Sequence, residues 1–73
     1  MVRQFDEIQK DLAKNLRQAR LGVGLSQEAL ALAADVDRTY VSQIERAVGN
    51  PSIFVISKLS IFLKVDIKSL LNE

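Results

Sequence analysis

The chain contains no cysteine and no histidine, and it has only one proline and three glycines in 73 residues. Without cysteine it can form neither a disulfide nor a thiolate metal site. Without histidine it lacks the usual general base and metal ligand at neutral pH, and its glycines do not form a phosphate-binding loop. These absences argue against an enzyme, and we expect no metal, no cofactor and no small-molecule ligand.

Long hydrophobic runs are missing too. No apolar stretch approaches the roughly 20 residues of a membrane-spanning helix, and the start MVRQFDEIQK lacks the apolar part of a signal peptide. We therefore expect no membrane partner and a cytoplasmic location. The length fits one small domain, 1–73, whose core is near the lower limit for independent folding, so stability must come from helix packing or from oligomerisation.

The charges nearly cancel. Ten Lys and Arg residues against nine Asp and Glu give a net charge of +1. This balance neither favours nor excludes a nucleic-acid partner, so any basic surface must be local.

The most informative stretch is 25–46, LSQEALALAADVDRTYVSQIER, which predicts two short helices joined by a turn. Ser26 is a good N-cap for the first helix, because its hydroxyl can accept an unpaired N–H of the first turn. Leu30 and Ala33 or Ala34 then recur at helical spacing. The first helix should therefore run from Ser26 to near Asp35.

The turn and the second helix follow directly. Asp35 tolerates the left-handed backbone conformation of a tight turn, and Asp37 offers a second N-cap. Val41 and Ile44 give the apolar stripe of the next helix. Two helices separated by about three residues are typical of a helix-turn-helix.

Helical periodicity also describes the flanking segments. Residues 3–21 predict one long helix, ended by Gly22 and Gly24, because glycine adopts the left-handed conformation at little cost. The segment 47–52 contains the single proline and predicts a loop. In the first helix, the apolar stripe expected to face the protein core consists of Phe5, Ile8, Leu12, Leu16 and Ala19.

Two more helices are expected after the loop. One should run to about Lys64, with Ser52 in its first turn or as its N-cap, and a short one capped by Asp66 should follow. The expected fold is thus all-α, a compact bundle of five helices without a strand. Apolar residues expected on the inner faces of these two helices are Ile53, Ile56, Leu59, Leu63, Ile67, Leu70 and Leu71.

Taken together, these motifs resemble the repressor-like, XRE-type helix-turn-helix family, which includes lambdoid phage repressors and Cro proteins. The resemblance covers nearly the whole chain, from about Leu12 to Leu71. It is carried by LRQAR (16–20), GLSQEALA (24–31), DRTYVSQIER (37–46), NPS (50–52) and LKVDIKSLL (63–71). The segment DRTYVSQIER also resembles the recognition helix of restriction-modification controller proteins, which are small dimeric regulators.

This resemblance implies a sequence-specific DNA-binding transcriptional regulator that acts as a homodimer on a palindromic operator, with a restriction-modification controller favoured. The alternatives are a phage-type repressor, an antitoxin-like autoregulator, or a protein-interaction module on the same fold. Two positions depart from the family pattern. Ala34 and Asp35 stand where the family often has Gly at the turn, and Ala47 and Val48 stand where many relatives have Gly followed by a basic residue.

In a helix-turn-helix the second helix enters the major groove with its N-terminus first, and residues near that end reach base edges. An Arg can donate two hydrogen bonds to guanine, a Gln can pair with adenine, and a Thr offers its methyl group to thymine. The alternative is that these are ordinary solvated side chains on a surface helix. The expected base-reading residues are Arg38, Thr39, Ser42 and Gln43.

Four further residues are expected at the DNA backbone. Gln27 lies in the first turn of the first motif helix, where a phosphate contact is expected, although it can also be a plain helix-start residue. Arg46 and Asn50 are similarly placed at the end of the recognition helix and in the next loop. Tyr40 should pack its ring at the helix edge, with its hydroxyl within reach of a phosphate.

The resemblance gives a different role to Arg20 and Glu45. In relatives the matching pair forms a partly buried salt bridge between the first helix and the end of the recognition helix. We expect a structural salt bridge here, and neither residue should read DNA.

The fourth helix carries more apolar residues than one buried face can use. Phe54 and Ile61 are seven residues apart, as are Val55 and Phe62, so they line neighbouring stripes of the helix. An exposed stripe of this size usually marks a partner surface. These four residues are the expected dimer interface, unless some of them pack under the fifth or the first helix.

Overall fold

The structure is a computed structural model that describes residues 2–73, so Met1 of the expected domain lies outside the described residues. Over residues 2–73 the chain forms five helices and no strand, which confirms the predicted all-α fold. The helices are α1 (Phe5–Gly22), α2 (Gln27–Ala34), α3 (Arg38–Glu45), α4 (Ile53–Leu63) and α5 (Ile67–Leu71).

Side-chain caps fix the starts of three helices. Ser26, Asp37 and Ser52 each occupy the predicted N-cap, and their side-chain oxygens accept a backbone N–H of the first turn at 3.0, 2.8 and 3.1 Å. Each cap satisfies one of the N–H groups that have no partner within the helix. Asp66 is the N-cap residue of α5, as predicted, although its side chain makes no capping hydrogen bond.

Left-handed backbone conformations follow the first four helices, whereas α5 ends at Asn72 in an extended conformation. Asp35 has φ 56° at the end of α2, as the sequence predicted, and Lys64 has φ 61° at the end of α4. After α1 it is Gly24, with φ 76°, that takes this conformation, whereas Gly22 is still the last residue of the helix. Ala47 adopts φ 57° just after α3, at the position where the resemblance implies glycine in many relatives.

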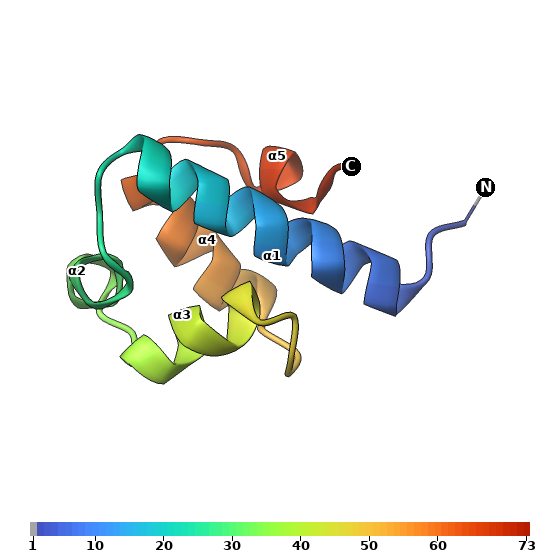
Figure 1. The fold of residues 1–73 in the computed structure, drawn as a ribbon, viewed down its shortest axis with the longest axis horizontal. Coiled ribbons are helices and arrows are strands. Elements are labelled where there is room, and N and C mark those ends of the chain that lie inside the picture. The colour runs from blue at the N-terminus through green and yellow to red at the C-terminus, as the bar shows by residue number, and fades with distance from the viewer. Residues whose placement is uncertain (1) are drawn as a thin grey trace.

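The helices pack so that α1 spans the rest of the molecule. It lies against α3 on one side and α5 on another, while α4 contacts α2 and α5 (Figure 1). Helices α2 and α3 are joined by residues 35–37 and pack against each other as the helix-turn-helix. Helix α3 therefore lies at the edge of the molecule, below α1 in Figure 1.

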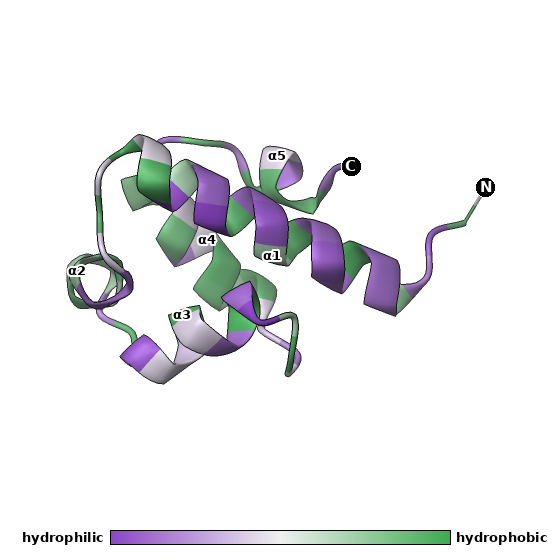
Figure 2. Ribbon diagram, viewed as in Figure 1, coloured by the Kyte–Doolittle hydropathy of each residue, from purple (hydrophilic) through white to green (hydrophobic). Residues whose placement is uncertain are grey.

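The core lies where these helices meet, and in Figure 2 helix α4 is hydrophobic over most of its length while the visible side of α1 is largely hydrophilic. Most of the predicted stripes are buried, but two predictions are wrong, because Ile53 is 72% exposed and Phe5 is exposed. In α2, Ala34 is the buried one of the two predicted alternatives, together with Ala31, while Ala33 faces solvent. The buried cluster consists of Leu12, Leu16, Leu30, Ala31, Ala34, Val41, Ile44, Ile56, Leu59, Leu63 and Leu70.

Ile53 and Phe5 are exposed for the same reason. Each is the first residue of its helix, beyond the part that the other helices cover. The two side chains line a shallow pocket of about 140 Å³ together with Pro51. Within residues 2–73, no helix combines the length and the apolar character needed to cross a membrane.

Candidate nucleic-acid interface

The outer face of α3 begins the candidate interface. Val41 and Ile44 turn into the core and the Glu45 side chain is buried at the end of the helix, so the other residues of the helix form its outer face. Arg38 and Thr39 at its N-terminal end are exposed, whereas Ser42 and Gln43 in its second half are partly buried. The four predicted base-reading residues thus lie on one helix, and the first two are more exposed than the other two.

The start of α3 is fixed by Asp37. Its carboxylate accepts the backbone N–H of Thr39, and this hydrogen bond holds the pKa of Asp37 below its ordinary value. A hydrogen bond to the ionised form stabilises that form. The cap therefore remains charged at neutral pH and sets the direction in which α3 leaves the turn.

The turn before α3 is held by α4. Lys58 Nζ donates a hydrogen bond to the backbone oxygen of Asp35 at 3.2 Å. The same ammonium group lies 5.2 Å from the centre of the Phe54 ring, within the range of a cation–π contact. Lys58 thus connects the turn of the helix-turn-helix to the exposed apolar face of α4, a role that its place in the sequence did not suggest.

Arg20 and Glu45 form the salt bridge between α1 and α3. Arg20 Nε donates to Glu45 Oε2 at 2.6 Å and Nη2 donates to Oε1 at 3.0 Å, while Nη1 donates to the backbone oxygen of Leu25 at 2.9 Å. The side chains are 8% and 2% exposed. The hydrogen bonds from Arg20 to Glu45 raise the pKa of the guanidinium further. The pair is buried between α1 and α3. It therefore does not face the solvent side of α3, where base edges would lie.

Glu45 also contacts two other side chains. Gln27 Nε2, from the first turn of α2, donates to Glu45 Oε1 at 3.2 Å. Arg17 Nη1 lies 3.9 Å from the same oxygen. The sequence pattern indicated no role for Arg17, although its spacing of three residues from Arg20 places both on one side of α1.

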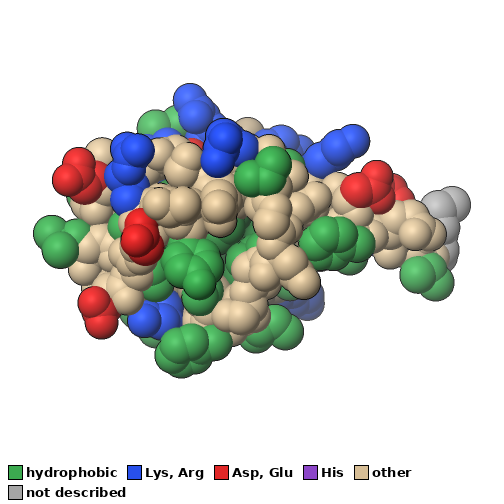
Figure 3. Space-filling view, turned by 90° about the horizontal axis from the view of Figure 1, so that it is seen from below, with side chains coloured by type: hydrophobic (Ala, Val, Ile, Leu, Met, Phe, Trp, Pro, Cys, Tyr) green, Lys and Arg blue, Asp and Glu red, His purple; other side chains and the backbone are tan. Residues whose placement is uncertain are grey.

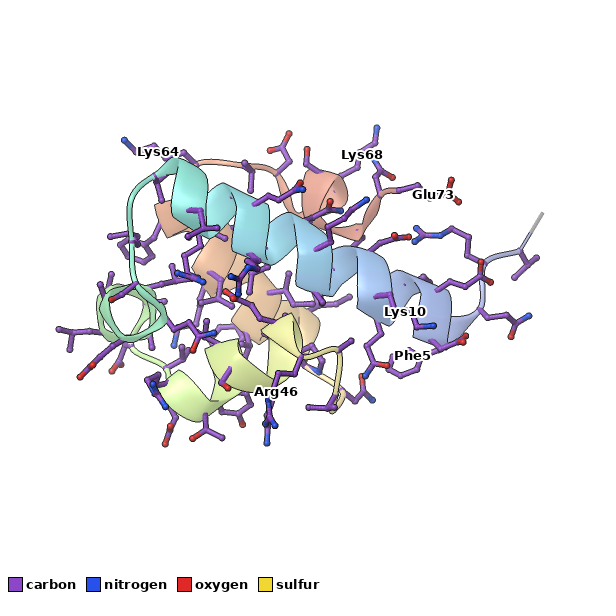
Figure 4. The ribbon with its side chains drawn as sticks, viewed as in Figure 1. Phe5, Lys10, Arg46, Lys64, Lys68 and Glu73 are labelled. Atoms are coloured by element: carbon purple, nitrogen blue, oxygen red, sulfur yellow. The ribbon has the colours of Figure 1, made fainter. Side chains whose placement is uncertain are left out.

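The loop after α3 carries the remaining predicted backbone contacts. Arg46 and Asn50 are both exposed, and Arg46 points away from α1 at the outer side of α3 (Figure 4). Gln9 of α1 donates to the backbone oxygen of Gly49 at 2.6 Å and so ties this loop to the bundle. Tyr40, on α3, is half exposed.

The surface seen from below, on the side of α3, carries most of its basic side chains at one edge. In Figure 3 most of the visible Lys and Arg side chains lie along the upper edge, whereas hydrophobic side chains are scattered over the centre, both ends and the lower edge. The net charge of +1 therefore hides a local concentration of basic side chains. Among the described residues, no group of three or more acidic, Cys or His side chains is arranged to hold a metal ion.

Helix α4 carries several exposed apolar side chains. Phe54 and Ile61 are 70% and 67% exposed, and Phe62 is also exposed. Val55 differs, because it is only partly exposed and packs against the core. Val55 thus fits the alternative expectation that some of these residues pack within the chain. Ile53, which was expected to be buried, is exposed like Phe54 and Ile61.

Comparisons with known proteins agree with this geometry. Residues 16–70 match the HTH_3 helix-turn-helix family. The chain is 45% identical over 60 residues to the control protein C.BamHI of Bacillus amyloliquefaciens, and this match covers 81% of this chain and 74% of that protein. The structure of the restriction-modification controller protein C.AhdI from Aeromonas hydrophila superposes with a TM-score of 0.80 at 37% identity, covering 85% of this chain and 94% of that one.

A third relative is the regulator SinR. The chain is 40% identical over 63 residues to SinR of Bacillus licheniformis, covering 85% of this chain but only 57% of that protein. SinR solved in complex with DNA superposes with a TM-score of 0.78 at 37% identity, covering 84% of this chain and 98% of that one. The family match and these relatives confirm the resemblance: the chain belongs to the HTH_3 family of helix-turn-helix, DNA-binding transcriptional regulators.

Proposed function

We propose that the protein is a restriction-modification controller, a homodimeric regulator that binds a palindromic operator and acts in the cytoplasm on nearby genes. Its similarity to C.BamHI and C.AhdI supports this assignment. The observation that carries it is the N-terminal end of α3, where Arg38 and Thr39 stand in solvent on a helix anchored from behind by Val41 and Ile44.

Sequence recognition would come from α3. Arg38 can donate two hydrogen bonds to O6 and N7 of a guanine, and Thr39 can contact a neighbouring thymine methyl group. Ser42 and Gln43 lie one turn further on and are partly buried, so they would approach base edges only when the helix is deep in the groove. Arg38 should therefore contribute most of the discrimination between sequences.

Four residues around α3 would fix its position on the duplex. Gln27 lies at the start of α2 and Tyr40 on the outer side of α3, while Arg46 and Asn50 follow that helix. Contacts of this kind to phosphates set register and orientation without reading sequence. They frame α3 from both ends, as a helix lying in the groove requires.

A second copy is needed because one helix of eight residues reads few base pairs. Two copies related by a twofold axis would present two α3 helices to half-sites about one helical turn apart. The exposed face of α4, with Phe54, Ile61 and Phe62 and the partly exposed Val55, is the surface that we assign to this contact.

Selection of bound duplexes from a random pool tests the proposal. The expected product is a palindrome whose half-site centres are about 10–10.5 base pairs apart. Enrichment of a single asymmetric site would refute the homodimer, and no enrichment would refute sequence-specific binding. The position of matching sites, upstream of restriction-modification genes or elsewhere, separates a controller from a phage-type repressor or an antitoxin-like autoregulator.

The apolar face of α4 also supports a second candidate function, a protein-interaction module that uses this fold without DNA. Binding to random duplex as a function of salt separates the two. Contacts to several phosphates release counterions, so log K must fall linearly with log salt concentration. Binding that does not depend on salt, or no binding at low salt, would favour the interaction module.

A further inference from the structure

A polar cluster connects three helices at the side of α3. At its centre is Glu45, whose side chain is 2% exposed and whose Oε1 accepts from Arg20 Nη2 at 3.0 Å and from Gln27 Nε2 at 3.2 Å. Arg17 Nη1 approaches the same oxygen to 3.9 Å. Residues from α1, α2 and α3 thus meet at one carboxylate oxygen.

The two arginines of the cluster differ in how many of their N–H groups remain free to bind an external acceptor. Arg20 is buried and directs three of its nitrogens to Glu45 and Leu25. The side chain of Arg17 is 61% exposed, and a separation of 3.9 Å is an ionic contact rather than a hydrogen bond. The N–H groups of Arg17 therefore remain available to an external acceptor.

Gln27 has a similar spare donor. Its amide nitrogen carries two N–H groups, and the contact to Glu45 uses one of them. Gln27 lies in the first turn of α2, where unpaired backbone N–H groups and the helix dipole favour an anion. Two free side-chain donors, one of them cationic, thus lie around the start of α2.

We propose that Arg17 is a DNA backbone contact that binds the same phosphate as Gln27, and that Glu45 positions both donors. This inference rests on the proposed DNA-binding function. Arg20 already neutralises the carboxylate, so with Arg17 the cluster carries one net positive charge toward an approaching phosphate. Glu45 then does two things at once: it joins α3 to α1 through Arg20, and it orders a phosphate clamp through Gln27 and Arg17.

The test measures the salt dependence of binding to the selected operator and to random duplex. Arg17→Ala should reduce the slope of log K against log salt by about 0.9, the value for one lost phosphate contact, and should weaken both duplexes by the same factor. Lys68→Ala is the matched control, because Lys68 is an exposed cation of α5 on the side of the molecule opposite Arg46 (Figure 4). An unchanged slope in Arg17→Ala overturns the proposal.

A double-mutant cycle tests whether one phosphate is shared. If Arg17 and Gln27 bind the same group, the combined variant should lose less affinity than the two single losses predict. Additive losses overturn the shared site. If the wild-type protein shows no salt-dependent binding, the proposed function itself fails, whereas normal wild-type binding with an unaltered Arg17→Ala slope overturns this inference alone.

Discussion

Arg20 and Glu45 make two parallel hydrogen bonds across the contact between α1 and α3, at 2.6 and 3.0 Å, and both side chains are almost completely buried. A buried charge is costly when its partner is missing. Each residue therefore depends on the other, and the position of the recognition helix on α1 depends on the pair.

The first prediction follows from this pair. Glu45→Gln should lower the free energy of unfolding by about 3 kcal/mol, because it leaves the Arg20 guanidinium buried without a counter-charge. Arg38→Ala alters an exposed side chain and should change that free energy by less than about 0.5 kcal/mol. Urea unfolding of the two variants at pH 7 gives the comparison. The reverse order would contradict a structural role for the pair.

The second prediction concerns acid. The folded-state pKa of Asp37 lies below its ordinary value of 3.8, because the carboxylate accepts the N–H of Thr39. As the pH falls, the carboxyl group of Asp37 is therefore protonated in the unfolded chain before it is protonated in the folded one. The stabilisation by the cap is complete above pH 3.8, the pKa of the unfolded chain, and is lost as the pH falls through the lower folded-state pKa. Asp37→Asn keeps an oxygen acceptor that does not titrate, and its stability should fall less steeply than that of wild type in this range.

Thermal unfolding between pH 2 and pH 6 measures the effect, and Asp37→Ala is the control. Without an acceptor, Asp37→Ala should be less stable than wild type at pH 6 and should show the same shallow acid dependence as Asp37→Asn. If Asp37→Asn keeps the full wild-type acid dependence, the cap does not contribute to it.

The sequence predicted the helices because their boundaries depend on neighbouring residues. Ser26, Asp37 and Ser52 cap the helices that follow them, and Asp35 takes the left-handed conformation between α2 and α3. The same locality applies to part of the site. Within this short helix, the helical periodicity alone places Arg38 on the outer face and Val41 on the inner face.

The errors arise where the outcome depends on helices distant in sequence. Ile53 and Phe5 fit apolar stripes, but nothing in the periodicity shows that the other helices end before they reach these first turns. The contact of Lys58 with the Asp35 oxygen and that of Arg17 with Glu45 likewise require the packing of α4 on α2 and of α1 on α3. Such contacts link segments that the sequence leaves unrelated.

The third prediction tests the turn after α3. Ala47 holds φ 57°, which costs an L-residue with a Cβ roughly 1 kcal/mol or more, and glycine avoids this cost. Ala47→Gly should therefore raise the free energy of unfolding by about 0.5–1 kcal/mol. Ala33→Gly is the control, because the same change at an exposed position inside α2 should lower it by about 1 kcal/mol. Urea unfolding midpoints distinguish these opposite signs, and a loss of stability in both variants would exclude strain at Ala47.

The fourth prediction separates base contacts from phosphate contacts. Arg38→Ala should remove the preference for guanine at one position of each half-site, a loss of about 1–3 kcal/mol for that base. Arg46→Ala should instead weaken all duplexes alike and reduce the salt slope by about 0.9. Competition binding with single-base operator variants measures both patterns. If Arg38→Ala weakens every duplex equally, Arg38 is a backbone contact and the assignment of base reading is wrong.

The fifth prediction tests the apolar face of α4 as the dimer interface. Phe54 and Ile61 are mostly exposed in the single chain, so Phe54→Glu and Ile61→Glu should leave the fold intact but place a charge in the contact between copies. Sedimentation at micromolar concentration should show a dimer for wild type and a monomer for both variants, with weaker operator binding because the half-sites are then bound separately. Leu32→Glu is the matched control, since Leu32 is 82% exposed on α2, outside this face, and should remain dimeric. A wild-type monomer, or dimers in all four proteins, would show that the α4 face is not the contact between copies.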